Sequence, residues 1–179
     1  MTRRTVLQIL AGFIHAAMGL ALSIPALRFL AHPLKRKRRS AEFMRIAPLS
    51  AVPPHAPIRV AVSAVRVDGF LNFPSAPIGQ VWLDRPAPSA DGSTAVRCLQ
   101  TICPHLGCAI DLNTARTGFT CPCHASDFTR DGARRTGPAP RSMDELECRV
   151  STPDTSGERW VEIRYQEFRT GIAQREFLS

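Results

Sequence analysis

The sequence predicts a mostly antiparallel β fold that follows a single N-terminal transmembrane helix. Near the start of the chain, a run of twenty-three residues without formal charge separates Arg4 from Arg28. From Ile58 onward, short stretches of alternating apolar residues are broken by proline and glycine, and no long amphipathic helical pattern interrupts them. Two loops rich in cysteine and histidine lie among these stretches. These observations divide the 179 residues into an anchor, a tether and a β domain.

Residues 1–31 are expected to form a twin-arginine-like signal and a membrane anchor. The charge-free run reads TVLQILAGFIHAAMGLALSIPAL, and as a helix it is long enough to cross a hydrocarbon core of about 30 Å. A cleaved signal peptide is the alternative, but its apolar segment usually spans only about 7–15 residues. The start of the chain, TRRTVLQ, resembles the twin-arginine export signal, which a receptor reads. We therefore expect a retained, single-pass helix.

The positive charge of the chain is concentrated in its first fifty residues. Residues 1–50 contain nine Lys or Arg and a single acidic residue, Glu42, and they account for the whole formal net charge of +8. Residues 51–179 hold fourteen basic and fourteen acidic residues. A domain without net positive charge lacks the basic face that phosphate binding needs, which argues against nucleic acid as a partner.

Residues 32–57 are expected to form a basic, proline-rich tether. The segment passes from the basic cluster KRKRR at 35–39 into APLSAVPPHAP and shows little periodicity, a composition typical of semi-extended linkers. The basic cluster follows the helix, so the positive-inside rule would keep the β domain in the cytoplasm. A receptor-read export signal can override that bias, and the cysteines discussed below favour export.

Residues 58–179 are expected to form the β domain. Alternating apolar residues predict strands at 58–62, 80–84, 94–99, 118–121, 146–150 and 160–165. Cys98 and Cys148 lie in two of these strands, where buried thiols are favoured over a second disulfide.

Four residues of the two loops have the spacing of metal ligands. Cys103 and His105 form a Cys-x-His motif, and after fifteen intervening residues Cys121 and His124 form a Cys-x-x-His motif. Two cysteines and two histidines can hold tetrahedral zinc or a [2Fe–2S] cluster. The spacing alone leaves both open, so a structural zinc module is one hypothesis.

Two further cysteines, Cys108 and Cys123, lie beside these candidate ligands. A bridge between them would tie the loops together, close a ring of about sixteen residues and stabilise the fold by about 3 kcal/mol in the chain-entropy model. Such a bridge would also indicate an oxidising compartment. The alternative is that both are free thiols or additional zinc ligands.

The two loops, CPHLGC and CPCHAS, together with GPAP at 137–140, resemble the Rieske iron–sulfur subunits of cytochrome bc-type and b/f-type quinol-oxidising complexes. The resemblance covers about residues 58–165 and extends to the anchor and tether. It implies a Rieske-type β fold with a small cluster-binding subdomain at about 98–140 and one [2Fe–2S] cluster.

The resemblance also implies a role for each loop residue. Cys103 and Cys121 would ligate the buried iron, and His105 and His124 the exposed outer iron. A disulfide would join the remaining pair, Cys108 and Cys123. The loop that covers the cluster would consist of Gly137, Pro138, Ala139 and Pro140.

The segment that follows His124 contains three residues that influence the reduction potential. By resemblance, Ser126 would donate its hydroxyl to a bridging sulfide. Ala125 stands where the family usually has Gly, and Phe128 where high-potential members have a Tyr that hydrogen-bonds a ligand thiolate. Without that bond more electron density stays on sulfur, so we expect a lower potential than in ubiquinol-linked relatives, one that fits menaquinol.

The resemblance implies an electron-transfer subunit that is active only within a complex. An outward ring nitrogen of His124, with His105 as its companion, would take a proton from a quinol as the cluster takes an electron. The implied partners are a cytochrome b subunit and a c-type or f-type cytochrome. Leu106, at the loop tip, would be either an exposed docking residue or packed beneath the proline loop.

The expected location is a bacterial inner membrane, with the head on the periplasmic side. The alternative function is the small Rieske subunit of an arsenite oxidase-type molybdenum enzyme, which also carries an export signal. The retained apolar span and the GPAP loop favour the first hypothesis.

Overall fold

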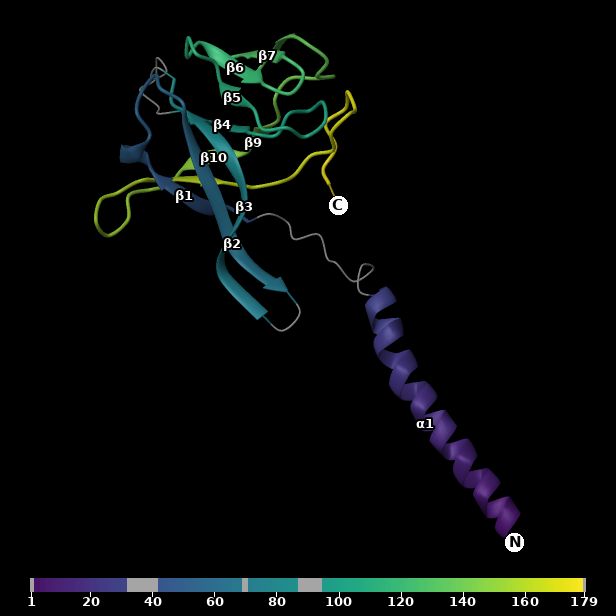
Figure 1. Cartoon of the computed structure of the whole chain (residues 1–179). Helices are drawn as coiled ribbons and strands as arrows, with labels where there is room; N and C mark the ends of the chain where they lie inside the picture. Colours follow the sequence, from purple (N-terminus) through teal and green to yellow (C-terminus); the bar gives the residue numbers. More distant parts are fainter. Residues whose placement is uncertain (1, 32–41, 69–70, 87–94, 179) are drawn as a thin grey trace. The chain divides into compact units, whose positions relative to one another are not determined.

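The chain forms two units, Met1–Arg39 and Ser40–Ser179, in a computed structural model that describes residues 2–31, 42–68, 71–86 and 95–178 (Figure 1). The first unit contains one helix, α1 (Arg3–Ala31), whose 29 residues correspond to about 43 Å. By length and composition α1 is able to cross a membrane. His15 hydrogen-bonds through Nδ1 to the carbonyl oxygen of Ala11 at 2.7 Å, so its polar ring has a partner within the helix.

The described residues of the second unit form three antiparallel sheets, which confirms the predicted fold class. The first sheet has the order β1 (Met44–Pro48), β11 (Trp160–Ile163) and β10 (Cys148–Val150). The second has the order β2 (Ile58–Asp68), β3 (Leu71–Asp84), β4 (Arg97–Gln100) and β9 (Glu145–Leu146). The third has the order β5 (Asp111–Leu112), β6 (Gly118–Cys121), β7 (Ser126–Thr129) and β8 (Arg134–Thr136).

Two hydrophobic clusters divide this unit into two lobes. The first and second sheets enclose one cluster, and we call them the base lobe; this cluster includes Val62, Val81 and Ile163, all without exposed surface. The third sheet, with the loops around it, forms the site lobe. Its cluster includes Phe119 and Phe128, and it also takes in Trp82 from the second sheet. Strand β7 alternates between buried and half-buried residues because successive side chains point to opposite faces of a sheet.

Strand β1 shows that the predicted tether of residues 32–57 is too long. Met44 pairs with Ile163 and Pro48 with Trp160 in an antiparallel ladder. Ala47, Leu49 and Val52 are buried in the base lobe. Residues from 44 onward therefore belong to the β fold, while residues 32–41 lie outside the described part of the chain.

Several predicted strands have different bounds in the structure, and two differ in kind. The strand predicted at 80–84 is the end of the much longer β3, and the strand predicted at 146–150 is divided between β9 and β10, which belong to different sheets. The predicted subdomain at 98–140 begins too early, because β4 belongs to the second sheet.

The two cysteines outside the loops are free thiols, as predicted. Cys98 is fully buried in the base lobe and Cys148 is half-buried beside the same cluster. Burial raises the pKa of the Cys98 thiol far above its ordinary value and that of Cys148 to about 12. Both therefore remain protonated at neutral pH and pack as small apolar groups.

Candidate metal centre

The two cysteine and histidine loops are built alike. In the first loop the N–H of Gly107 donates to the carbonyl oxygen of Cys103 at 3.0 Å, and in the second the N–H of Ala125 donates to that of Cys121 at 3.0 Å. Gly107 and Ala125 both have a positive φ, of 83° and 54°. A left-handed residue four positions after the cysteine thus closes each loop.

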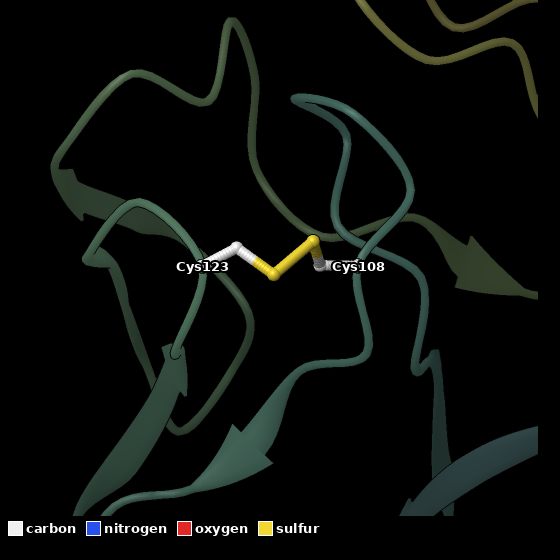
Figure 2. The surroundings of a disulfide bond; sticks show 2 residues. All are labelled: Cys108 and Cys123. Carbon is white, nitrogen blue, oxygen red and sulfur yellow. A yellow bond between two sulfur atoms is a disulfide. The ribbon is translucent and has the colours of Figure 1, made fainter.

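The predicted disulfide between Cys108 and Cys123 is confirmed, and it joins the two loops (Figure 2). Their Cα atoms lie 6.5 Å apart, within the usual range for a disulfide. The Sγ atom of Cys121 lies within 4.8 Å of both bridged sulfurs. Because the bridged sulfurs are bonded to each other, the alternative of free thiols or additional zinc ligands is excluded.

The four candidate ligands form an inner pair and an outer pair. Cys103 and Cys121 are free thiols, each 1% exposed. His105 is half-buried and His124 is exposed, and their rings are perpendicular with centroids 4.8 Å apart. The structure therefore brings the four residues together, with the thiols inside and the imidazoles toward the surface.

Burial is the main influence on the ionisation of the inner thiol of Cys103. It raises the pKa of Cys103 to about 11, against the lowering effect of the His105 backbone N–H and the Ser126 hydroxyl; the neighbouring Cys121 raises it further. The buried Cys103 thiol thus resists ionisation. A metal ion would reverse this, because it binds the thiolate form.

One ring nitrogen of His105 shows that these residues fit a metal group. His105 Nδ1 is buried and has no hydrogen-bond partner in the described part of the chain. An unpaired buried polar atom is costly, so such an atom requires a further partner. With two buried thiols and a second imidazole beside it, the donor set is the nitrogen and sulfur set that iron–sulfur or zinc sites use.

The proline loop, Gly137–Pro140, packs directly on the second ligand loop. The N–H of Ala139 donates to the Oγ of Ser126 at 3.1 Å, and Ser126 is fully buried. Gly137 has a φ of 89°, and a Cβ atom there would lie 2.4 Å from the Cα of Ser126. Since Ser126 Oγ accepts from this loop, its own hydrogen is available for a sulfur acceptor.

Phe128 lies beneath the inner thiols. It is fully buried, pairs across the strands with Phe119 and belongs to the same cluster as Cys103 and Cys121. The indole Nε1 of Trp82 donates to the carbonyl oxygen of Ile110 at 3.0 Å and completes this apolar floor. As a phenyl group, Phe128 donates no hydrogen bond to a ligand sulfur.

The C-terminal segment supports the first loop, which the sequence did not reveal. The N–H of Gly171 donates to the carbonyl oxygen of Pro104 at 2.8 Å. Arg141, paired with the buried Asp144 at 2.8 Å, donates to the carbonyl oxygens of Arg169 and Ile172 at 2.7 and 2.5 Å. The one available signal was an Arg and an Asp three residues apart just after the proline loop, a spacing too common to be informative.

Leu106, at the tip of the first loop, is 63% exposed. It therefore does not pack beneath the proline loop, and the alternative of an exposed residue at the tip holds. An exposed leucine next to His105 gives the tip an apolar surface.

Comparisons with known proteins point to one domain family. The model of the Rieske [2Fe-2S] domain matches residues 80–152. The chain is 36% identical over 83 residues to the cytochrome b6-f complex iron-sulfur subunit 2, chloroplastic, of Nicotiana tabacum; the match covers 46% of this chain and 35% of that protein. It is 36% identical over 84 residues to the cytochrome b6-f complex iron-sulfur subunit of Parasynechococcus marenigrum (strain WH8102), covering 47% and 44%.

Among solved structures, the cyanobacterial plasma membrane Rieske protein PetC3 from Synechocystis PCC 6803 aligns with a TM-score of 0.37 and 23% identity, over 57% of this chain and 84% of that one. The chain spans about a third of the length of the first curated relatives it matches. The matched segment contains both loops, the disulfide and the proline loop. The chain therefore contains a Rieske [2Fe–2S] domain at residues 80–152.

Proposed function

We propose that this chain is the membrane-anchored iron–sulfur subunit of a cytochrome bc-type or b/f-type complex, and that it carries electrons from a quinol to a c-type or f-type cytochrome. The observation that carries the proposal is the pair of buried thiols beneath two outer imidazoles, 4.8 Å apart, in a Rieske domain closed by a disulfide. Relatives named as cytochrome b6-f iron-sulfur subunits support the choice of complex.

In this proposal Cys103 and Cys121 hold the inner iron, and His105 and His124 hold the outer one. When bound, the cluster supplies one-electron transfer at a moderate potential, since two neutral imidazoles replace two thiolates. Ser126 donates its hydroxyl toward sulfur while its oxygen holds the proline loop through Ala139. The apolar floor and the proline loop keep water from the inner thiols.

The proton of the quinol goes to an outer imidazole. His124 is exposed, so the ring nitrogen that does not bind iron can accept a hydrogen bond from a quinol hydroxyl. This nitrogen of His124 would take one proton from the quinol, and a cluster held by the four ligands would supply the acceptor for one electron. Leu106, exposed beside His105, provides an apolar contact for the cytochrome b subunit that holds the quinol.

The disulfide supports the proposed side of the membrane. Cys108 and Cys123 are bridged, and structural disulfides persist in oxidising compartments. With α1 as the anchor, the N-terminus lies in the cytoplasm and the head on the periplasmic side of a bacterial inner membrane, and the twin-arginine-like start serves as the export signal.

Isolation of the chain from its native membrane tests this function. We expect a b-type cytochrome to copurify, a rhombic low-temperature EPR spectrum after dithionite reduction, and quinol:cytochrome c reductase activity. His124→Asn should abolish the activity and the spectrum, whereas the matched His55→Asn, at an exposed histidine of the base lobe, should leave both intact. A large molybdopterin subunit in place of the b-type cytochrome would overturn the proposal, and an EPR-silent zinc protein would do the same.

A further inference from the structure

The C-terminal segment folds back on itself, and we call residues 167–178 the C-terminal hairpin. Phe168 and Phe177 form an antiparallel bridge, and the centroids of their rings lie 5.1 Å apart. The N–H of Arg169 donates to the carbonyl oxygen of Glu176 at 2.9 Å. Phe168 is buried in the cluster of the base lobe. The hairpin is thus fixed to the base lobe, and residues 170–175 connect its two arms.

These connecting residues lie against the first ligand loop. The N–H of Gly171 donates to the carbonyl oxygen of Pro104 at 2.8 Å. A Cβ atom at Gly171 would lie 3.7 Å from the carbonyl oxygen of His105, and one at Gly107 would lie 3.9 Å from the Cγ2 of Thr170. The hairpin therefore lies close to the backbone before and after the side chain of His105.

One arginine holds the hairpin in this place. Arg141 donates to the carbonyl oxygens of Arg169 and Ile172 at 2.7 and 2.5 Å. Its guanidinium also forms a two-pronged pair with the carboxylate of Asp144, at 3.0 and 2.8 Å. The two side chains are only 10% and 4% exposed, so little water competes for these bonds. The planar, five-donor guanidinium can make all of these contacts at once, which the single ammonium group of a lysine cannot do.

The carboxylate that holds Arg141 is itself attached to the base lobe. The carbonyl oxygen of Asp144 accepts from the N–H of Gln100, in β4, at 2.8 Å. The side-chain amide of Gln100 donates to the carbonyl oxygen of Gln166, the residue before the hairpin, at 2.9 Å. A continuous set of hydrogen bonds thus leads from β4 through Asp144 and Arg141 to the hairpin, and from the hairpin to Pro104.

The place of Arg141 in the chain connects this support to the second ligand loop. Arg141 directly follows Pro140, the last residue of the proline loop, and that loop packs on the second ligand loop through the N–H of Ala139. In the proposed function one iron is held by His105 and His124, which come from different loops. Such a ligand set must be held within about 0.5 Å of its working geometry. The two loops therefore need a fixed relative position.

We propose that Arg141 is a positioning residue for His105: through the C-terminal hairpin it fixes the backbone of the first ligand loop, and with it the orientation of the His105 ring. The disulfide holds this loop at Cys108, after the tip, and the hairpin holds it at Pro104, before the tip. The proposal rests on the proposed function, because it takes His105 as a ligand of the outer iron. Arg141 acts through the hairpin and not on the cluster itself.

Arg141→Lys in the full chain with its cluster tests this role. The variant keeps the positive charge but loses the two-pronged pair and the donors to the hairpin. Arg130→Lys is the matched control. Arg130 forms the same kind of pair with the buried carboxylate of Asp84, at 2.9 and 2.6 Å, and it has no hydrogen bond to the C-terminal hairpin in the described part of the chain. A general weakening of the fold should therefore appear in both variants.

Two measurements report the position of the first loop. Hydrogen exchange of residues 104–108 should become about tenfold faster in Arg141→Lys, because hydrogen bonds from a charged donor stabilise a closed segment by about that factor. Exchange of residues 122–126, in the second loop, should not change. Pulsed EPR of the reduced cluster resolves the nitrogens of the two ligand imidazoles, and the coupling of one of them should shift while the other stays. Arg130→Lys should match the parent chain in both measurements.

A chain that ends at Arg169 tests whether Arg141 acts through the hairpin. This chain keeps the buried Phe168 but lacks Gly171 and Ile172. Its EPR change should match that of Arg141→Lys, and Arg141→Lys in the shortened chain should cause no further change. A second change of similar size would show that Arg141 acts by another route and would refute the proposal.

The spectrum of the parent chain separates the possible failures. If the parent chain gives the rhombic spectrum and Arg141→Lys behaves like Arg130→Lys, the positioning role is refuted and the proposed function stands. If the parent chain gives no such spectrum, the proposed function fails, and the role of Arg141 toward an iron ligand fails with it.

Discussion

The base lobe and the site lobe hold their shapes by different means. In the described residues, the base lobe buries twelve residues in its cluster, joined by long strands and by pairing between β1 and β11, whose residues are more than one hundred positions apart. The site lobe has strands of only two to four residues, and two of the nine residues in its cluster are the inner thiols. Apolar burial is the main source of stability in the base lobe, whereas the site lobe depends on a few specific constraints.

Those constraints are concentrated around the ligand loops. Gly107, Ala125 and Gly137 all have positive φ values, and each lies in a ligand loop or in the loop that covers them. The disulfide joins the same loops. Compared with the base lobe, the site lobe has its geometry fixed by local constraints. A single substitution in the ligand loops should therefore unfold the site lobe while the base lobe stays folded.

The largest effect is expected for Gly137→Ala. The new Cβ would meet backbone atoms of Ala125 and Ser126 at 2.4–2.8 Å, and the φ of 89° is unfavourable for alanine. We expect a loss of about 4 kcal/mol from crowding and backbone strain together. Gly157→Ala is the control, since Gly157 has a φ of 80° and no atom within 4 Å, and should lose only about 1 kcal/mol. Denaturant unfolding measures both, and equal losses would show that crowding at the proline loop is unimportant.

Removal of the disulfide by Cys108→Ser with Cys123→Ser should come next. The site lobe should lose about 3 kcal/mol, because the bridge closes a loop with a sequence separation of 15 residues. Thermal loss of the visible absorption of the cluster reports the site lobe, and hydrogen exchange of β1 and β11 reports the base lobe. Faster exchange in β1 and β11 would contradict the independence of the two lobes.

Phe128→Tyr tests how the site lobe sets the potential. A hydroxyl on this buried ring, in the same cluster as Cys103 and Cys121, should donate to a ligand sulfur and raise the midpoint potential. One hydrogen bond of about 1 kcal/mol corresponds to about 40 mV for a one-electron couple. Ser126→Ala removes a donor and should lower the potential. EPR-monitored redox titration measures both, and a shift of the same sign in the two variants would disprove this explanation.

The base lobe should respond to acid through Glu162. Arg149, at 2.9 Å, and Arg45, at 3.3 Å, hold the pKa of this carboxyl below its usual range. A lowered pKa in the folded state stabilises the fold above the unfolded pKa, and this stability is lost as the pH falls through the folded pKa. Both arginines are more than half exposed, so the difference between the parent chain and Glu162→Gln should be less than about 1 kcal/mol. The free energies of unfolding of the parent chain and of Glu162→Gln, measured between pH 6 and pH 3, should converge at the acid end, as expected from ordinary carboxyl pKa values of about 4. If the difference between the two stayed constant over this range, Glu162 would not cause the acid sensitivity of the base lobe.

The loops of the site were predictable because their information is local. Cys103, His105, Cys121 and His124 lie in two short segments, and the structure brings all four together. The disulfide was predictable for the same reason, since the two surplus cysteines lie inside those segments. The assignment of individual ligands to each iron stays a prediction.

The features that the sequence did not reveal depend on long-range pairing. The strand β1, MRIAP, is short and ends in proline, and only its partner β11 defines it. The support of Pro104 by Gly171 joins residues 67 positions apart, through a segment without periodicity. The full length of β3 was hidden by Pro74 and Pro77, which usually mark the end of a strand.

The smallest predicted effect concerns the one non-glycine residue that closes a ligand loop. Ala125 has a φ of 54°, where a side chain is strained, whereas the equivalent position of the first loop is Gly107. Ala125→Gly should relieve the strain at the cost of more freedom in the unfolded chain, for a net gain of about 0.5 kcal/mol. Ala133→Gly, at an exposed site-lobe alanine without positive φ, should instead lose about 0.5 kcal/mol. The temperature at which the cluster absorption is lost compares the two variants. It should rise for Ala125→Gly and fall for Ala133→Gly, because only Ala125 carries strain. A lower temperature in both variants would show that the left-handed turn of the second loop does not destabilise the site lobe.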